Sequence, residues 1–428
     1  MNTRTYAYAG LTDVFRRGLA VSDAAARLQR LCFVEERLMF AQTAHFVSLP
    51  QRDLKSLLAR LQFNSGRHVQ GLRARLRELR VPKGVFPNGG LLQAPDETLE
   101  ILMDEALRAR GSEEIVAGAL FLHRQLCEAY ALYLEDTNHL ADAPSVDLIR
   151  PILAREEEAI RLLEAALADV ASSPQQQETA QAFTSLLHEY SCAAGSVDGT
   201  TEKGDKIARQ RSVEAFAIKH ELARDESLGR VWDFVAPPQQ EVGAHLAHMM
   251  SIRLSEINVA EGLGIVLYET TEKPWGFYFD ISRHLWDEVR HSLMGEAAIE
   301  STLGDRCALP MRDYEGVYCM EASPLEQYAT LGLEVEGANM RYPVGKRGEW
   351  EFCREMAHHP LMTTFQDYDW ADEVLHVNIA RAQLGQWFEG GARALSEFAA
   401  QGKQNRTQVK KRHAAVQLPP VPDDVLNR

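Results

Sequence analysis

The sequence is poor in the features that mark secreted, membrane-spanning or nucleic-acid-binding proteins. It has only six cysteines and no Cys-x-x-Cys pair, so it indicates neither a zinc knuckle nor a disulfide framework. No run approaches the roughly 20 apolar residues of a membrane span, and residues 1–17 lack a long apolar signal-peptide core. Positive charge is in deficit: the net charge is −15, which argues against nucleic acid or a membrane as partner. We expect a cytoplasmic protein.

Apolar residues recur at helical spacing along most of the chain, and strong strand-like alternation is missing. The sequence therefore predicts an all-α protein with an N-terminal helical bundle and a C-terminal four-helix bundle. Polar, Ser-, Gln- and Gly-rich runs mark a linker between them, and a basic, then Pro-rich end is typical of a tail. The expected parts are an N-terminal domain (1–170), a linker with one helix (171–235), the second bundle (236–402) and a flexible tail (403–428).

One pentapeptide occurs twice in the second half of the chain. Asp287-Glu288-Val289-Arg290-His291 returns as Asp372-Glu373-Val374-Leu375-His376, and each copy contains Glu-x-x-His. Residues i and i+3 share one face of an α-helix, so each copy presents a carboxylate and an imidazole in the same direction. A single Glu-x-x-His is usually a solvated helix face. Two copies beside large apolar residues favour two facing helices that bind metal.

Proline, glycine and capping residues divide the second half into four expected helices. The first follows Pro238 and reaches about Glu269. The second lies between Pro274 and Gly304, because proline is common in the first turn of a helix and glycine is common just after its last turn. The third opens with the capping box Ser323-Pro324-Leu325-Glu326 and stops before Pro343. The fourth follows Pro360 and ends near Gly390.

A four-carboxylate, two-histidine cage needs one further glutamate from each of the first and third helices. Glu256 shares an apolar stripe on the first helix, with Glu261 as the fallback, and Glu336 is preferred to Glu334 on the third. Carboxylates neutralise divalent ions and can bridge them, while imidazole suits iron and manganese. The predicted ligands are Glu256, Glu288, His291, Glu336, Glu373 and His376.

These residues support a resemblance to a known superfamily. The second half, about 238–400, resembles the ferritin-like di-iron carboxylate superfamily, and Asp287-Glu288-Val289-Arg290-His291 resembles the Asp-Glu-x-Arg-His motif of its bacterial multicomponent monooxygenase branch. The second pentad departs from that motif, with Leu375 in place of Arg. The resemblance implies that Asp287, Arg290 and Asp372 surround the ligands, and that the aspartates orient the metal-bound histidines.

The resemblance also implies a function. We expect an oxygenase or oxidase that binds two Fe ions, or Mn/Fe or Mn, and uses dioxygen as co-substrate to oxidise a small organic molecule. One alternative is a ferroxidase or iron-handling protein. Another is a non-catalytic helical interaction module, in which Glu288 and Glu373 would be exposed and metal-free. An electron-donor protein and a second copy of the chain stay open as partners.

The N-terminal half invites comparison with this bundle. Acids and histidines follow one another there in a similar order, without any Glu-x-x-His: Glu36, His45, His68, Glu128 and the run Glu156–Glu158. A duplicated bundle that lost its metal site would leave such a pattern. An unrelated helical domain with surface acids and hydrogen-bonded histidines would leave it too, and the sequence keeps both interpretations open.

Overall fold

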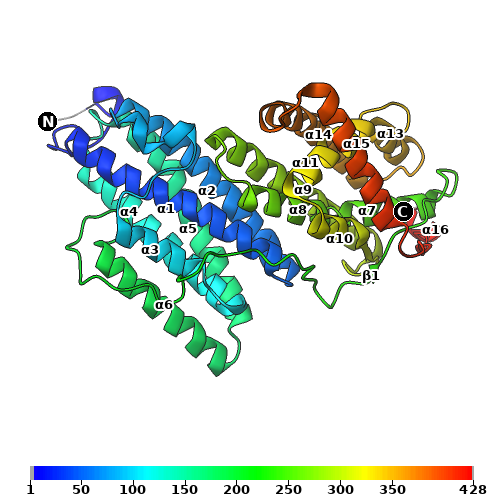
Figure 1. Cartoon of the computed structure of the whole chain (residues 1–428), viewed down its shortest axis with the longest axis horizontal. Helices are drawn as coiled ribbons and strands as arrows, with labels where there is room; N and C mark the ends of the chain where they lie inside the picture. The colour runs from blue at the N-terminus through cyan, green and yellow to red at the C-terminus, as the bar shows by residue number, and fades with distance from the viewer. Residues whose placement is uncertain (1–3, 427–428) are drawn as a thin grey trace. The chain divides into compact units, whose positions relative to one another are not determined.

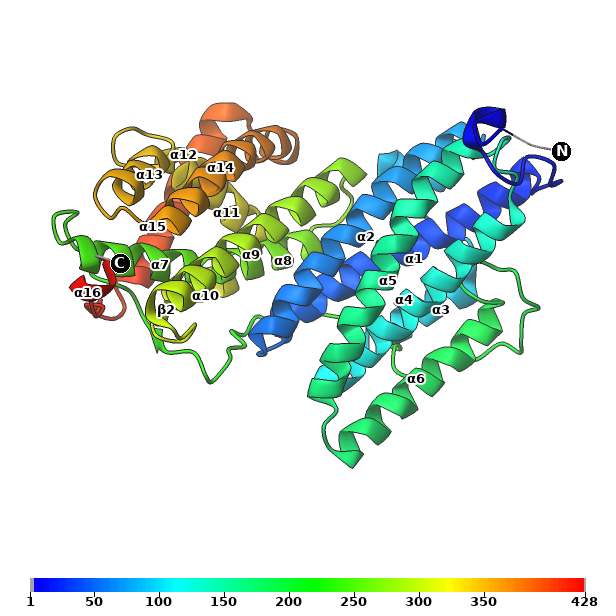
Figure 2. The ribbon, with the colours of Figure 1, turned by 180° about the vertical axis from the view of Figure 1, so that it is seen from behind.

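The chain forms two helical units in the computed structural model, which describes residues 4–426 (Figure 1 and Figure 2). The N-terminal unit comprises 1–45, 60–217 and 272–275, and the C-terminal unit comprises 46–59, 218–271 and 276–428. Within the described residues, the strands are limited to β1 (Arg230–Val231) and β2 (Met311–Arg312), which pair in parallel. The predicted all-α fold class is confirmed.

Six long helices build the N-terminal unit. They are α1 (Val21–Ser48), α2 (Arg52–Glu78), α3 (Glu97–Ala106), α4 (Gly111–Asp136), α5 (Ala143–Val170) and α6 (Pro174–Ala194). The end of α1 and the first turns of α2 belong to the C-terminal unit. Within the N-terminal unit α4 packs against α5 and α6, and α6 packs against α3. These contacts bury apolar stripes of the helices in one core.

Local sequence explains where several of these helices begin and end. Asp96 caps α3 by accepting hydrogen bonds from the backbone N–H groups of Thr98 and Leu99. Ser173 and Gln176 form a capping box at the start of α6. Gly195 ends α6 in the left-handed conformation, with φ of 73°, which glycine adopts without steric cost.

The C-terminal unit contains helices α7 to α16 and one π-helical turn. They are α7 (Val242–Leu254), α8 (Ile257–Glu269), α9 (Trp275–Leu303, within this unit from Gly276), α10 (Tyr314–Glu321), α11 (Pro324–Ala329), the π-helical turn η4 (Thr330–Val335), α12 (Glu336–Asn339), α13 (Lys346–Glu355), α14 (Pro360–Trp387), α15 (Gly391–Lys410) and α16 (Asp423–Leu426). Helix α8 packs against α10 and α11, and α14 packs against α13, η4 and α12.

Two of the four helices expected here are interrupted. The first is divided at Ser255 and Glu256, so that Glu256 stands between α7 and α8. The third begins at Pro324 behind the Ser323 cap, as predicted, but passes through η4 and ends at Asn339. A π-turn inserts a residue into the helical repeat and is frequent at functional sites. Both irregularities lie beside predicted ligands.

Two glycines allow the helices to approach closely. A Cβ on Gly295 of α9 would lie 2.2 Å from the backbone nitrogen of Leu254, at the end of α7. A Cβ on Gly332 of η4 would lie 2.2 Å from the Cβ of Ala380 on α14. Both distances are far below a van der Waals contact, so any larger side chain would push these helices apart.

The C-terminal segment differs from the predicted flexible tail. Residues up to Lys410 continue helix α15, because Val409 packs into an apolar cluster with Tyr318 and Ala322. Arg406 adds a hydrogen bond to the Tyr314 hydroxyl at 2.8 Å. Farther on, Val421 is buried. The tail is therefore held on the C-terminal unit by apolar contacts that its Lys- and Pro-rich composition conceals.

No helix among residues 4–426 combines the length and the apolar character that a membrane crossing demands.

Candidate metal centre

Two groups of potential ligands lie inside the C-terminal unit. Group 1 consists of His284, Glu288, Glu336 and His376, and group 2 consists of Glu256, His291, Asp369 and Glu373. Within each group the ligand atoms all lie within 4.8 Å of one another. The structure thus brings together all six predicted ligands, and it adds one residue to each group.

The two added residues, His284 and Asp369, were missed by the sequence argument. Each stands four positions before the glutamate of a pentad, Glu288 or Glu373. Residues i and i+4 share a helix face, so each helix presents three side chains to the interior rather than two. The repeat is therefore an octad, His-x-x-Asp-Glu-x-x-His in α9 and Asp-x-x-Asp-Glu-x-x-His in α14.

The same two helices, α9 and α14, supply ligands to both groups, but in opposite numbers. Helix α9 supplies two residues to group 1 and one to group 2, whereas α14 supplies one to group 1 and two to group 2. Each group is completed by one glutamate from an interrupted helix: Glu336 opens α12 after η4, and Glu256 lies at the break between α7 and α8. The irregular backbone thus provides the fourth ligand of each group.

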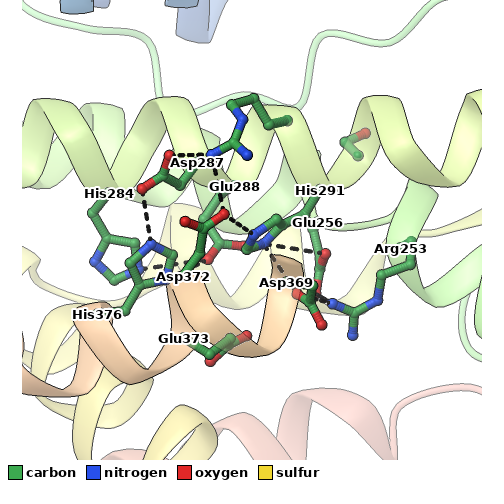
Figure 3. A network of polar contacts seen from close by, with 12 residues as sticks. Arg253, Glu256, His284, Asp287, Glu288, His291, Asp369, Asp372, Glu373 and His376 are labelled. Atoms are coloured by element: carbon green, nitrogen blue, oxygen red, sulfur yellow. Dashed lines mark hydrogen bonds and ion pairs between the residues drawn. The ribbon is translucent and has the colours of Figure 1, made fainter. Parts of the chain in front are cut away.

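Glu288 connects the groups. Its Oε1 lies 3.2 Å from His376 Nδ1 in group 1, while its Oε2 lies 3.7 Å from His291 Nδ1 in group 2. His284 Nε2 lies 2.8 Å from Glu336 Oε1, and the rings of His284 and His376 stack with centroids 3.8 Å apart. Figure 3 shows His284 and His376 at one end of the centre, Asp369 at the other and Glu288 between them. The two oxygens of Glu288 thus face different groups.

Group 2 also contacts two buried cations. Lys346 Nζ lies 2.8 Å from both Asp369 Oδ2 and Glu373 Oε1, and 4.0 Å from Glu256 Oε1. Arg253 Nη1 lies 2.8 Å from Glu256 Oε1 and forms a second ion pair with Asp369. These charges offset the mutual repulsion of three buried carboxylates. In group 1, the recorded ion pairs of Glu288 and Glu336 are made with imidazoles.

The aspartates of the pentads hold the histidines crosswise. Asp287 of the first pentad lies 3.4 Å from Nε2 of His376, and Asp372 of the second lies 3.4 Å from Nε2 of His291. Arg290 donates hydrogen bonds to both aspartates, at 2.6 Å and 3.0 Å. Arg283 pairs with the same two aspartates, at 2.6 Å and 3.7 Å. Two guanidinium groups of α9 therefore contact both pentads, and the second pentad has Leu375 where the first has Arg290. A carboxylate behind a metal-bound imidazole fixes its orientation and tautomer.

Burial and neighbouring charges shift the pKa values of these groups strongly. Burial raises the pKa of Glu256 to about 8. Burial disfavours protonated His284, but Glu336 and Glu288 outweigh it and raise the pKa of His284 to about 10. Burial also disfavours the Asp287 carboxylate, yet hydrogen bonds from His376 and Arg283 lower its pKa to about 2. Without metal the centre thus holds protons that a metal ion has to displace.

Unpaired atoms test whether a metal fits. Seven of the eight residues carry a buried side-chain atom without a hydrogen-bond partner: Glu256 Oε2, His284 Nδ1, Glu288 Oε1, His291 Nδ1, Glu336 Oε2, Glu373 Oε2 and His376 Nδ1. Buried polar atoms are normally satisfied, because leaving one unpaired costs about 1–3 kcal/mol. Five carboxylates and three imidazoles are also a donor set suited to iron or manganese. The residues present therefore fit divalent metal ions.

A cavity of about 790 Å³ reaches the centre. Its lining includes four of the glutamates, Glu256, Glu288, Glu336 and Glu373. The walls beside them contain apolar side chains, among them Met249, Ile252, Val259, Leu331 and Val335. A volume of this size accommodates a small organic molecule next to the carboxylates.

The fallback ligands lie elsewhere. Glu261 is buried and forms ion pairs with Lys55 and Arg224, and the carboxylate of Glu334 lies 3.0 Å from Lys403 Nζ. Neither residue belongs to group 1 or group 2. Both carboxylates are paired with cations, so their charges are already balanced.

The N-terminal unit contains a third group of this kind, Glu35, His68 and Glu156. His68 and Glu156 belong to the series noted in the sequence, but the other partner is Glu35 rather than Glu36. Glu36 instead accepts hydrogen bonds from Arg73 and the backbone N–H of Leu92. Glu128 is exposed. The residues that come together are therefore decided by the helix face that each one occupies, and not by their order in the sequence.

The fold and this centre define an all-α protein with buried clusters of carboxylates and imidazoles that are able to bind metal ions. No family model, curated protein or solved structure matches the chain.

Proposed function

We propose that this protein is a ferritin-like di-metal carboxylate oxidoreductase that uses dioxygen to oxidise a small organic substrate. One observation carries the proposal: groups 1 and 2 are adjacent, buried and joined by Glu288, whose two oxygens face histidines of different groups. Helices that present Glu-x-x-His in pairs, with one glutamate from each of two others, are the ligand pattern of di-metal bundles.

Group 1 would hold one ion and group 2 the other, with Glu288 in contact with both. Two irons, or a manganese in place of one or both, would supply the electrons and open coordination positions that dioxygen chemistry requires. The protein's own residues do the rest. Asp287 would accept a hydrogen bond from Nε2–H of His376, and Asp372 from Nε2–H of His291, which would leave Nδ1 of both rings available as a ligand atom.

The cavity has room for an organic substrate beside the glutamates. Its lining combines apolar side chains, such as Met249 and Ile252, with charged ones, such as Arg312 and Lys403, so a molecule with both apolar and polar groups would fit it. The interaction-module alternative requires exposed pentad glutamates. Glu288 and Glu373 are only 2% and 3% exposed, which counts against that alternative.

The test is to load the protein with Fe(II) without oxygen and then follow the oxidation of the iron after adding dioxygen. Wild-type protein should oxidise its bound iron rapidly, and His376→Ala should lose this ability. His245→Ala is the matched control, because His245 lines the same cavity but its Nδ1 lies 2.9 Å from the Pro237 carbonyl oxygen. Equal rates in all three proteins would contradict the proposal.

Excess Fe(II) separates the two catalytic alternatives. An oxidase or oxygenase without its organic substrate should stop after the bound ions react, whereas a ferroxidase should continue to consume added Fe(II). Continued turnover, with the product released as ferric iron, would replace the oxygenase proposal with the ferroxidase alternative.

A further inference from the structure

Lys346 is a charged side chain in an unusual position. It is the first residue of α13 and is 1% exposed. Its ammonium group lies 2.8 Å from both Asp369 and Glu373. A lysine is almost never fully buried unless it is paired, and here its partners are two of the four residues of group 2.

The ammonium group stands among the oxygens that would surround a metal ion. Lys346 lies within ion-pair distance of all three carboxylates of group 2, Glu256, Asp369 and Glu373. A divalent ion bound by the same oxygens would meet a like charge at close range in a poorly screened interior. The two cations therefore compete for one set of ligands.

In the recorded ion pairs of group 1, no lysine or arginine competes for the carboxylates. Glu288 and Glu336 pair with His284 and His376, and imidazoles release a proton and become ligands when metal binds. The ammonium group of lysine has no lone pair and cannot become a ligand in this way, so Lys346 has to leave the oxygens of Asp369 and Glu373 before an ion binds them. The two metal positions are therefore unequal.

We propose that Lys346 is a tethered cation that closes the group 2 position and must withdraw before a second metal ion binds, so that the centre loads in order, group 1 first. This inference rests on the proposed metal-binding function and adds a control over it. Charge balance agrees: the five carboxylates of the two groups, opposed by Arg253 alone, carry four negative charges, which two divalent ions neutralise.

The fold leaves space for the withdrawal. Lys346 follows a segment in which Tyr342 and Val344 are 62% and 87% exposed. Pro343, Val344 and Glu349 on either side of it line the same cavity of about 790 Å³ that reaches Glu373. Rotation of the long side chain into this cavity would keep the ammonium group solvated while it frees Asp369 and Glu373.

The first experiment is an anaerobic calorimetric titration of the full-length protein with Co²⁺. Wild type should bind one ion tightly and a second more weakly. Lys346→Met, which keeps the length of the side chain and removes its charge, should tighten the second step by about tenfold or more, since it removes the cost of populating the open state. Lys403→Met is the matched control, because Lys403 lines the same cavity but pairs with Glu334.

The outcomes are distinct. An unchanged second step in Lys346→Met would overturn the inference while leaving the metal-binding function in place. Absence of Co²⁺ binding in wild type would instead overturn the proposed function itself. An equal gain in Lys403→Met would show a general charge effect and would also overturn the inference.

The second experiment needs no substitution, so it covers the case in which Lys346→Met does not fold. Wild-type protein is acetylated briefly with acetic anhydride at increasing Co²⁺ occupancy, and modified lysines are identified by mass spectrometry. Lys346 should stay protected with one ion bound and become modified when the second binds. The half-exposed Lys403 is the control, and its modification should be the same at every Co²⁺ occupancy. Protection of Lys346 in the fully loaded protein would contradict the withdrawal.

Discussion

Both units bury histidines among carboxylates, but the two clusters differ in how many of their buried polar atoms have hydrogen-bond partners. In the N-terminal unit α1, α2, α4 and α5 each supply one residue of a cluster that consists of Glu35, His68, His123 and Glu156. We call it the N-terminal cluster. It has two imidazoles for two carboxylates. The candidate metal centre has three imidazoles for five carboxylates, and Lys346 and Arg253 pair with the carboxylates of group 2.

Hydrogen bonding strengthens the contrast. In the N-terminal cluster His68 Nδ1 lies 2.9 Å from Glu35 Oε1, and His123 Nδ1 lies 2.6 Å from Glu156 Oε2. Tyr130 donates a further hydrogen bond to Glu35 at 3.0 Å. Two atoms stay unpaired here, Glu35 Oε2 and His68 Nε2, against seven in the metal centre. Both clusters are built from carboxylates and imidazoles, so the number of buried atoms without a hydrogen bond is what distinguishes the candidate metal centre from the N-terminal cluster.

The largest expected effect comes from breaking each cluster at a central glutamate. Glu288→Ala should abolish binding of two metal ions, because Glu288 faces both groups, while circular dichroism should still report a helical protein. Glu156→Gln should leave the metal content unchanged and lower the melting temperature instead, because it removes a buried ion pair. Metal content measured after reconstitution checks both variants. Loss of metal in Glu156→Gln alone would reverse the assignment of the two clusters.

The next effect separates two glutamates on the third helix of the bundle. Glu336→Ala should weaken metal binding by about tenfold or more, since Glu336 is buried in group 1. Glu334→Ala should have little effect, because its carboxylate pairs with Lys403. A competition assay with a metal-binding dye measures both affinities. A larger loss at Glu334 would mean that the ligand from this helix is misassigned by two positions.

A smaller effect is expected outside the two groups. Asp287→Asn should weaken metal binding by up to about tenfold, because the amide holds His376 less firmly than the carboxylate does. The change should appear mainly at group 1. Asp372 contacts His291, so Asp372→Asn should act mainly at group 2. Identical losses of the same ion in both variants would contradict the crosswise pairing.

The smallest effect is a pH dependence of the N-terminal cluster. Burial opposes the charge on His68, but Glu35 and Glu156 raise the pKa of His68 to about 9. Because the pKa of His68 is higher in the folded protein than its value near 6.5 in the unfolded chain, protonation of His68 stabilises the fold. This stabilisation is complete below about pH 6.5 and is lost as the pH rises through about 9. Between pH 6.5 and 9 we expect a loss on the order of 1–3 kcal/mol. Thermal unfolding of wild type and His68→Gln checks this: the variant should lack that slope, and parallel curves would contradict it.

Sequence patterns predict the helices best where punctuation residues act locally. Pro274 and Gly304 bracket α9, and the Ser323 cap opens α11 as expected. The break at Glu256 and the turn η4 were not predicted, because both depend on contacts with neighbouring helices. A close approach such as that of Gly332 to Ala380 has no local signal in the sequence.

The candidate site was predicted only in part, for a similar reason. The Glu-x-x-His spacing identifies the inward face of α9 and α14, and the same face extended by one turn would have included His284 and Asp369. Glu35 was missed in favour of its neighbour Glu36, which one residue of helix phase turns by about 100°. Lys346 lies beyond an irregular segment and joins group 2 only through the fold, so no spacing in the chain predicts it.

The central claim is that groups 1 and 2 hold two metal ions while the N-terminal cluster holds none. Elemental analysis tests this most directly, on protein reconstituted without oxygen with excess Fe(II) or Mn(II) and then freed of loosely bound ions. We predict about two ions per chain in wild type and in Glu156→Gln, with loss of both in Glu288→Ala. Metal-free wild-type protein after reconstitution with either ion would contradict the account.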